Sequence, residues 1–164
     1  MAVFSEYRRR NSPQPEFLSP EFSRYLYFTM EQRDFIIDEI RKFGQMVLGL
    51  LGKLQQSRLM QQYDFNLSMA DLEFESEAGF TLKMLIEMES SSLEAFLNGH
   101  HELNSENTEL LADLLIEISE DPGIDSRQAL ARAKELLEFV DLRERTYALE
   151  RAGKMEFIDA KLNQ

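Results

Sequence analysis

The segment from Asp34 to Leu54, with the sequence DFIIDEIRKFGQMVLGLLGKL, constrains the fold of this chain more than any other. Apolar residues recur in it at steps of three and four positions, which places them on one face of a helix. After Phe43 the apolar face widens until almost every position is apolar. A helix that is apolar on nearly all sides has to be covered on several of them, so the sequence predicts that this helix lies at the centre of the fold.

Three glycines fall inside this predicted helix, and each costs about 1 kcal/mol relative to alanine in a helix interior. One explanation is that a neighbouring helix approaches Gly44, Gly49 and Gly52 so closely that no side chain fits. The other is that a ligand lies against the bare backbone. Because no polar residues converge on this part of the chain, we favour close helix packing.

Apolar spacing predicts further helices along the rest of the chain. Leu72 and Phe74 alternate with acidic residues as in a strand, but no second strand is available to pair with this segment. We therefore expect a helix from Ser68 to Glu89, with Leu72 facing inward. Further helix starts are predicted at Pro20 after Ser19, at Thr29 with Gln32, at Ser90–Ser92, after Ser105, at Asp125 or Ser126, and at Thr146.

The sequence thus predicts an all-α fold, a multi-helix bundle of antiparallel helical hairpins. With 164 residues, 43% of them hydrophobic, the chain can bury a core without a disulfide or a metal ion. We expect residues 20–164 to form a single helical domain. Residues 1–19 contain Pro13 and Pro15 and no periodic apolar face, so we expect them to form a flexible N-terminal arm.

Composition excludes several classes of function. The chain has no cysteine, which rules out thiol catalysis, disulfides and cysteine-ligated metal sites and fits a reducing cytoplasm. No segment approaches the roughly 20 apolar residues that a membrane-spanning helix needs. The N-terminus lacks the apolar stretch of a signal peptide. We therefore expect a cytoplasmic protein with no membrane partner.

The net charge of −12 is concentrated in the middle of the chain. Residues 66–120 contain thirteen acidic residues and one basic residue, Lys83, whereas the segments on either side are nearly balanced. Such a field repels phosphate, so we do not expect nucleic-acid binding. The acidic segment either recruits a basic partner or forms a solvated face that keeps the protein soluble.

Few residues have the spacing of a catalytic or metal site. His100 and His101 are adjacent, so on a helix they would point about 100° apart and could not ligate one metal ion as an i, i+4 pair does. Asp121 and Asp125 flank a turn but lack the distal glutamate of a calcium loop, which makes this segment a helix stop. We predict no catalytic, cofactor-binding or metal-binding residue, and no cofactor.

Two segments resemble an uncharacterised family of small bacterial helical proteins. Arg33–Leu54 is similar to the opening helix of that family, with its Asp-hydrophobic start. Leu136–Ile158 is similar to its closing Thr-Tyr/Phe-x-x-Glu-Arg-x-x-Lys run. The family has no assigned activity, so the resemblance implies only that Glu150 and Arg151 are its signature pair. The alternative is that these two residues form an ordinary ion pair or helix cap.

The C-terminal half also resembles a tetratricopeptide-type hairpin. The two helices would be Ser105–Glu120 and Ser126–Arg143. The resemblance places the small and large packing positions of the second helix at Ala129, Ala133, Leu136 and Leu137.

The leading hypothesis for function is a non-enzymatic protein–protein interaction or scaffolding module. It would present a helical groove or an acidic face to another protein of unknown identity. The alternative is a small-molecule or metal-binding helical bundle that uses carboxylates and His100 or His101. A third hypothesis is that the apolar central helix completes a homo-oligomer.

Overall fold

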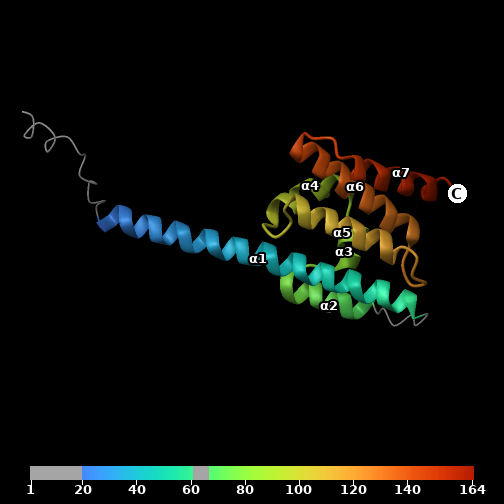
Figure 1. Ribbon diagram of the computed structural model, residues 1–164, viewed down its shortest axis with the longest axis horizontal. Helices are drawn as coiled ribbons and strands as arrows, with labels where there is room; N and C mark the ends of the chain where they lie inside the picture. Colours follow the sequence, from blue (N-terminus) through green and yellow to red (C-terminus); the bar gives the residue numbers. More distant parts are fainter. Residues whose placement is uncertain (1–19, 61–66) are drawn as a thin grey trace, which may run out of the picture. The chain divides into compact units, whose positions relative to one another are not determined.

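The computed structural model describes residues 20–60 and 67–164, and within these ranges it contains seven α-helices and no strand. The all-α class is therefore confirmed. The predicted arm, residues 1–19, lies outside the described residues. The helices are α1 Pro20–Leu59, α2 Leu67–Ala78, α3 Leu82–Glu87, α4 Ser90–Gly99, α5 Ser105–Ile118, α6 Ser126–Glu144 and α7 Leu149–Leu162 (Figure 1).

The chain divides into two compact units, Met1–Phe35 and Ile36–Gln164. Helix α1 begins at Pro20, as predicted, and runs without interruption through the boundary to Leu59. The capping box expected at Thr29 therefore does not start a new helix. None of the described helices is long and apolar enough to cross a lipid bilayer.

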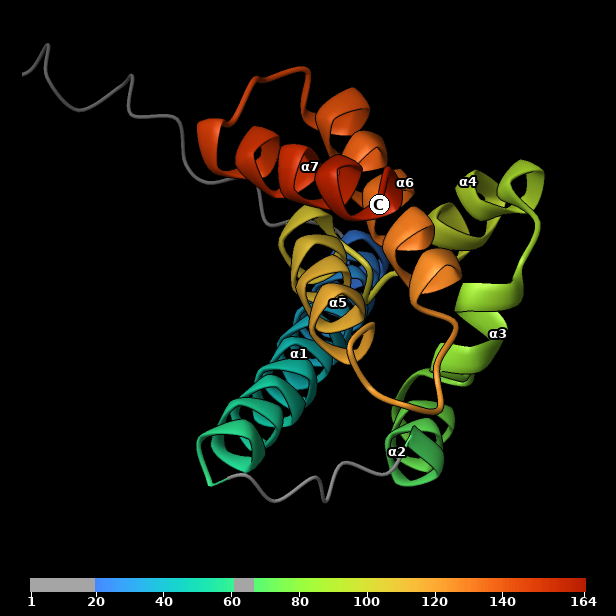
Figure 2. The ribbon, with the colours of Figure 1, turned by 90° about the vertical axis from the view of Figure 1, so that its right-hand side faces the viewer.

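Helix α5 is the most deeply buried element of the second unit. In both views it lies between α1 on one side and α6 and α7 on the other (Figures 1 and 2). Its packing with α6 is the most extensive between any two helices. Half of its fourteen residues are buried, namely Asn107, Thr108, Leu111, Ala112, Leu114, Leu115 and Ile118.

The prediction that the segment 34–54 forms the centre of the fold is therefore wrong. The core side of α1 is a single stripe with helical spacing, whose buried members are Phe43, Val47, Leu50, Leu51 and Leu54. On other sides of the same helix the exposed fractions of Ile37 and Leu48 are 51% and 53%. The apolar run indicated which residues can be buried, but neighbouring helices cover only one side of it.

The glycines of α1 differ in their surroundings. A Cβ atom added to Gly44 would lie 2.6 Å from Oδ1 of Asn107. The amide nitrogen of Asn107 donates hydrogen bonds to the backbone oxygens of Ile40, at 2.8 Å, and Glu102, at 2.7 Å, so this side chain is held in place. Close packing thus explains Gly44. It does not explain Gly49 or Gly52, because no atom of residues 20–60 or 67–164 lies within 4 Å of a Cβ atom added to either.

The segment predicted as one helix from Ser68 to Glu89 forms two. Helix α2 ends before Gly79, whose φ of +73° lies in the left-handed region that glycine adopts without strain. The Thr81 side chain then caps α3 by accepting from the Met84 backbone nitrogen at 3.0 Å. Glycine at a helix end is a signal that the sequence analysis overlooked.

The inward face of α2 also differs from the prediction. Ala70 and Phe74, four residues apart, are buried, whereas Leu72 points away from the core and is 65% exposed. The Phe74 ring packs edge-on against Phe43 of α1, with centroids 5.6 Å apart. Helix spacing therefore selects Phe74 as the core residue and leaves Leu72 on the surface.

Three later helix starts test the predicted caps. Asn104 caps α5 by accepting from the Asn107 backbone nitrogen at 2.8 Å, and Asp125 caps α6, as predicted, by accepting from Gln128 at 3.1 Å. Helix α7 begins at Leu149, three residues beyond the predicted cap Thr146.

We expect Gly44→Ala and Gly49→Ala to change stability in opposite directions. An added methyl group at Gly44 collides with the held Asn107 side chain, which should lower the free energy of unfolding by about 1–3 kcal/mol. At Gly49 the methyl group meets open space, and the better helix former should raise stability by about 0.5–1 kcal/mol. Urea unfolding monitored by circular dichroism measures both. A change of the same sign in the two variants would contradict the packing described here.

Candidate functional site

The predicted histidine candidates lie in the turn between α4 and α5. The His100 ring packs against the rings of Phe80 and Phe96, with centroid distances of 5.2 and 4.4 Å. Its Nδ1 atom lies 2.7 Å from Oε1 of Glu102, whereas His101 is exposed. Across the described ranges, no three histidine or carboxylate side chains are grouped so that they could hold a metal ion. The local contacts of His100 are those of a packing residue.

Asp121, in the predicted helix stop, is a carboxyl group in a desolvated position. Burial raises its pKa, and a weaker attraction to Arg58 opposes this shift. In the described part of the chain its Oδ2 atom is buried without a hydrogen-bond partner. Among the described residues, the carboxylate that lies beside a histidine is Glu102, next to His100, and not Asp121.

Arg151 is the most deeply buried charged residue among those described, with an exposed fraction of 2%. Its Nε donates to Oδ1 of Asp141 at 2.5 Å, and its Nη2 donates to Oε2 of Glu144 at 3.1 Å, both on α6. Its Nη1 donates to Glu109 of α5. One guanidinium group thus joins α7 to the two helices beneath it.

The electrostatics of this site favour the charged guanidinium. Burial, the largest single influence, lowers the pKa of Arg151, but the hydrogen bonds that it donates to Asp141 and Glu144, together with attraction to Glu109, raise the pKa above its usual value. Glu150 and Arg151 pair with different residues, because the 86% exposed side chain of Glu150 lies 3.7 Å from Lys154, whereas Arg151 is buried among carboxylates of α5 and α6. Both residues therefore form ion pairs, the alternative given for them in the sequence.

Much of the acidic excess of the middle segment is neutralised by basic residues from elsewhere in the chain. Four carboxylates at the surface of α5 or just after it form ion pairs with α1 or α7. They are Glu109 with Arg151, Asp113 with Lys154 at 2.8 Å, Glu117 with Arg58 at 2.6 Å, and Glu120 with Arg58 and Lys161, each at 3.4 Å. Charge that is separated along the sequence is therefore paired in space, and these residues do not form a free acidic face.

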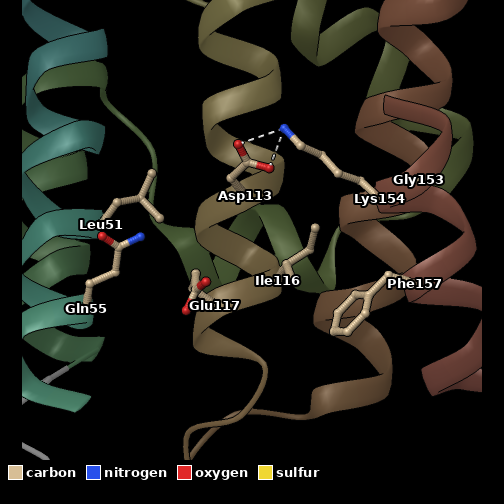
Figure 3. Close-up of a pocket in the computed structure, with 8 residues that line it drawn as sticks. All are labelled: Leu51, Gln55, Asp113, Ile116, Glu117, Gly153, Lys154 and Phe157. Atoms are coloured by element: carbon tan, nitrogen blue, oxygen red, sulfur yellow. Dashed lines mark hydrogen bonds and ion pairs between the residues drawn. The ribbon is translucent and has the colours of Figure 1, made fainter. Parts of the chain in front are cut away.

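A cleft of about 450 Å³ lies above this part of α5, with α1 and α7 as its walls (Figure 3). Figure 3 shows Lys154 reaching across it to both carboxylate oxygens of Asp113. Glu117 binds Arg58, so each charged residue that lines the cleft already has a partner. The cleft can admit a small molecule, but its charged side chains would first have to release their ion pairs. The lining residues are Leu51, Gln55, Asp113, Ile116, Glu117, Gly153, Lys154 and Phe157.

A second depression, the α1–α2 groove, has a different chemistry. Its volume is about 510 Å³. Met69 and Leu72 of α2, three residues apart, line it with exposed fractions of 64% and 65%, and the partly buried Met46 of α1 faces them. The full lining is Lys42, Gln45, Met46, Met69, Leu72, Glu73, Ser76 and Glu77. This groove combines exposed apolar side chains with a row of carboxylates.

The carboxylates of the α1–α2 groove are only partly neutralised. Glu73 lies 3.3 Å from Lys53 in an exposed pair, and Glu77 has no ion-pair partner within 4 Å among the described residues. Lys42 pairs with Asp38 of its own helix at 2.9 Å, and that hydrogen bond, together with a weaker attraction to Glu77, raises the Lys42 pKa. The carboxylates of the groove are therefore less closely paired than those at the surface of α5.

Comparison with protein-family models, curated proteins and solved structures finds no match to this chain. What the fold and its surface define is a small all-helical protein with one ion-paired cleft and one acidic, partly apolar groove. The α1–α2 groove was not predicted from the sequence, because Leu72 was expected in the core. Ala70, Phe74 and Ala78 are four residues apart and share one helix face. This spacing predicts that Leu72 lies on the opposite, exposed side.

We expect Arg151→Ala to destabilise the protein by about 3 kcal/mol, toward the lower end for a broken buried ion pair, because it leaves three clustered carboxylates without their counter-charge. Urea unfolding of the full chain measures the loss. The matched control is Arg33→Ala, which removes an exposed arginine from α1 and should change stability by less than about 0.5 kcal/mol. Equal effects of the two substitutions would show that Arg151 does not join the helices.

Proposed function

We propose that this protein is a non-enzymatic interaction module that binds another protein through the α1–α2 groove. The observation that carries the proposal is the exposure of Met69 and Leu72 side by side on α2. Full burial of a side chain of this size is worth about 1.5–3 kcal/mol, so a partner that covers both gains a substantial part of its binding free energy there. Methionine also adapts its shape to a partner at low cost.

The state of the other charged groups supports this choice of surface. In the α1–α5–α7 cleft, a ligand would compete with the Asp113–Lys154 and Glu117–Arg58 pairs. In the α1–α2 groove the ion pairs are Lys42–Asp38 and Lys53–Glu73, whose lysines are exposed, and exposed ion pairs contribute little to stability. Contact is therefore less costly at the groove.

The C-terminal half fits the role of scaffold within this proposal. The small residues Ala129 and Ala133 and the large residues Leu136 and Leu137 of α6 are fully buried where α6 packs against its neighbours. This is the packing expected of the second helix of a tetratricopeptide-type hairpin, the resemblance noted in the sequence. We propose further that the chain is related to tetratricopeptide-type hairpins and to the family of small bacterial helical proteins, and that the protein is located in the cytoplasm.

Site-specific crosslinking tests the proposed function. A photoreactive phenylalanine analogue replaces Leu72 in the full chain, and the matched control carries it at Leu142, which is equally apolar and 78% exposed on α6. After irradiation of cells that produce the protein, we expect a discrete protein adduct from position 72 that mass spectrometry identifies, and no such adduct from position 142. The Met69→Asp substitution should remove the adduct. Identical products from the two positions, or none, would refute the proposal.

The alternative function, a metal or small-molecule site at the histidines, predicts a different result. His100 already contacts Glu102, Phe80 and Phe96. We therefore expect the purified full chain to contain no stoichiometric metal ion by elemental analysis, and the double variant His100→Ala, His101→Ala to give the same trace content. A stoichiometric metal ion that is lost in the variant would favour the alternative.

A further inference from the structure

We infer that the α1–α2 groove accepts a cationic amphipathic helix, whose apolar side chains contact Met46, Met69 and Leu72 and whose backbone passes close to Gly49. The inference rests on the proposed function and specifies the chemistry and conformation of the partner. Three independent observations carry it: the charge of α2, the spacing of the exposed apolar side chains, and the open space beside Gly49.

The charge of α2 identifies the sign of the partner. Helix α2 carries four acidic residues, Asp71, Glu73, Glu75 and Glu77, and no basic one. Asp71 accepts hydrogen bonds from the backbone nitrogens of Leu82 and Lys83, at 2.7 and 3.3 Å, and so is used within the fold.

The other three carboxylates are exposed or half-buried on α2, and two of them, Glu73 and Glu77, line the groove. Glu73 has one exposed lysine at 3.3 Å, and in the described part of the chain Glu75 and Glu77 have no ion-pair partner within 4 Å. The carboxylates of α5, by contrast, are paired with α1 and α7. Lysine or arginine residues of a partner would form ion pairs with the carboxylates of α2, as α1 and α7 do with those of α5. Their charge would also raise the association rate.

The apolar side chains identify the conformation of the partner. Met69 and Leu72 are three residues apart, so they lie on one face of α2, and Met46 lies on the opposite wall of the groove. A groove between two helices with apolar side chains along it is the receptor surface of helix-in-groove recognition. A partner helix with apolar residues at spacings of three and four presents a matching stripe.

Gly49 indicates where such a helix approaches most closely. It follows Gln45 by four residues and Met46 by three, and both line the groove, so Gly49 continues that face of α1. A glycine in a helix interior costs about 1 kcal/mol relative to alanine, and no atom of the described residues lies within 4 Å of a Cβ atom added to Gly49. A partner backbone that packs against α1 at this point uses the space, because helix axes approach more closely where side chains are small.

Net charge argues against two other occupants. A second copy of this chain carries the same charge of −12 and would bring one acidic surface against another. A nucleic acid is repelled for the same reason. The remaining occupant with suitable charge inside this chain is the segment 1–19, with its Arg8–Arg10 run, and a synthetic peptide of that sequence serves as its probe.

Binding of designed peptides to the full chain tests the inference. The first probe is an 18-residue peptide of leucine and lysine with leucines at helical spacings of three and four. The second replaces every lysine by glutamate. The third has the composition of the first but distributes the leucines around the helix. Fluorescence anisotropy at about 0.15 M salt, where surface charges more than roughly 8 Å apart are screened, gives the three dissociation constants.

We expect the lysine peptide to bind at least about tenfold more tightly than either of the other two, which corresponds to 1.4 kcal/mol or more. Leu72→Asp should weaken it by about tenfold or more, whereas Leu142→Asp should not change it. The triple variant Glu73→Lys, Glu75→Lys, Glu77→Lys should reverse the preference toward the glutamate peptide.

The glycine variants test the position of the partner helix. Gly49→Leu should weaken the lysine peptide by about tenfold, and Gly153→Leu, which adds the same side chain to an equally open glycine on α7, should not. Circular dichroism and urea unfolding confirm that each variant is folded. If Gly49→Leu folds normally and binds as the unsubstituted chain does, the proposed close approach is wrong.

Other outcomes would overturn the inference about the cationic helix. They would not decide the proposed function, which the crosslinking experiment tests separately. Equal binding of the lysine peptide and its scrambled form would show charge attraction without groove recognition. If the 1–19 peptide binds more tightly than the lysine peptide, the occupant of the groove is the N-terminal segment of this chain. A dimer in light scattering that Leu72→Asp dissociates would assign it to a second copy. An adduct at position 72 with a partner that has no basic helix would leave the proposed function standing and refute this inference.

Discussion

The fold depends on the burial of a helix that is itself acidic. Helix α5 lies between α1, α6 and α7, and leucine, isoleucine and alanine side chains fill its core-facing positions. At its edges Glu109, Asp113 and Glu117 meet Arg151, Lys154 and Arg58 from two other helices. Apolar burial provides most of the driving force, and the ion pairs join α5 to α1 and α7 at its edges.

This arrangement explains why a chain with such uneven charge can fold compactly. Carboxylates on one segment would repel one another if basic residues did not approach them in the folded state. Helices α1 and α7 supply those basic residues, and Arg151 satisfies three carboxylates at once. Helix α2 receives much less compensation, and the difference between α2 and α5 is the basis for assigning the interaction surface.

The sequence predicted the all-α class, the start of α1 at Pro20 and the cap of α6 at Asp125, because helix spacing and capping are local properties. It did not predict how many sides of α1 are covered, since an apolar stripe does not specify the number of its neighbours. The role of Arg151 was equally hidden, because its partners are up to 42 residues away in the sequence. The α1–α2 groove could be predicted only by placing Leu72 correctly, and a strand-like alternation obscured the helical spacing of Ala70 and Phe74.

The contact that Asp71 makes across the Gly79 turn has a consequence for recognition. By accepting hydrogen bonds from the first backbone nitrogens of α3, it fixes α2 to a helix that is itself packed against α6. Helix α2, which supplies the acidic side of the groove, is therefore preorganised. Binding free energy of a partner helix is not used to order it. Most of the conformational entropy lost on association would then come from the partner helix, so its intrinsic helicity, more than the number of contacts, would set the affinity.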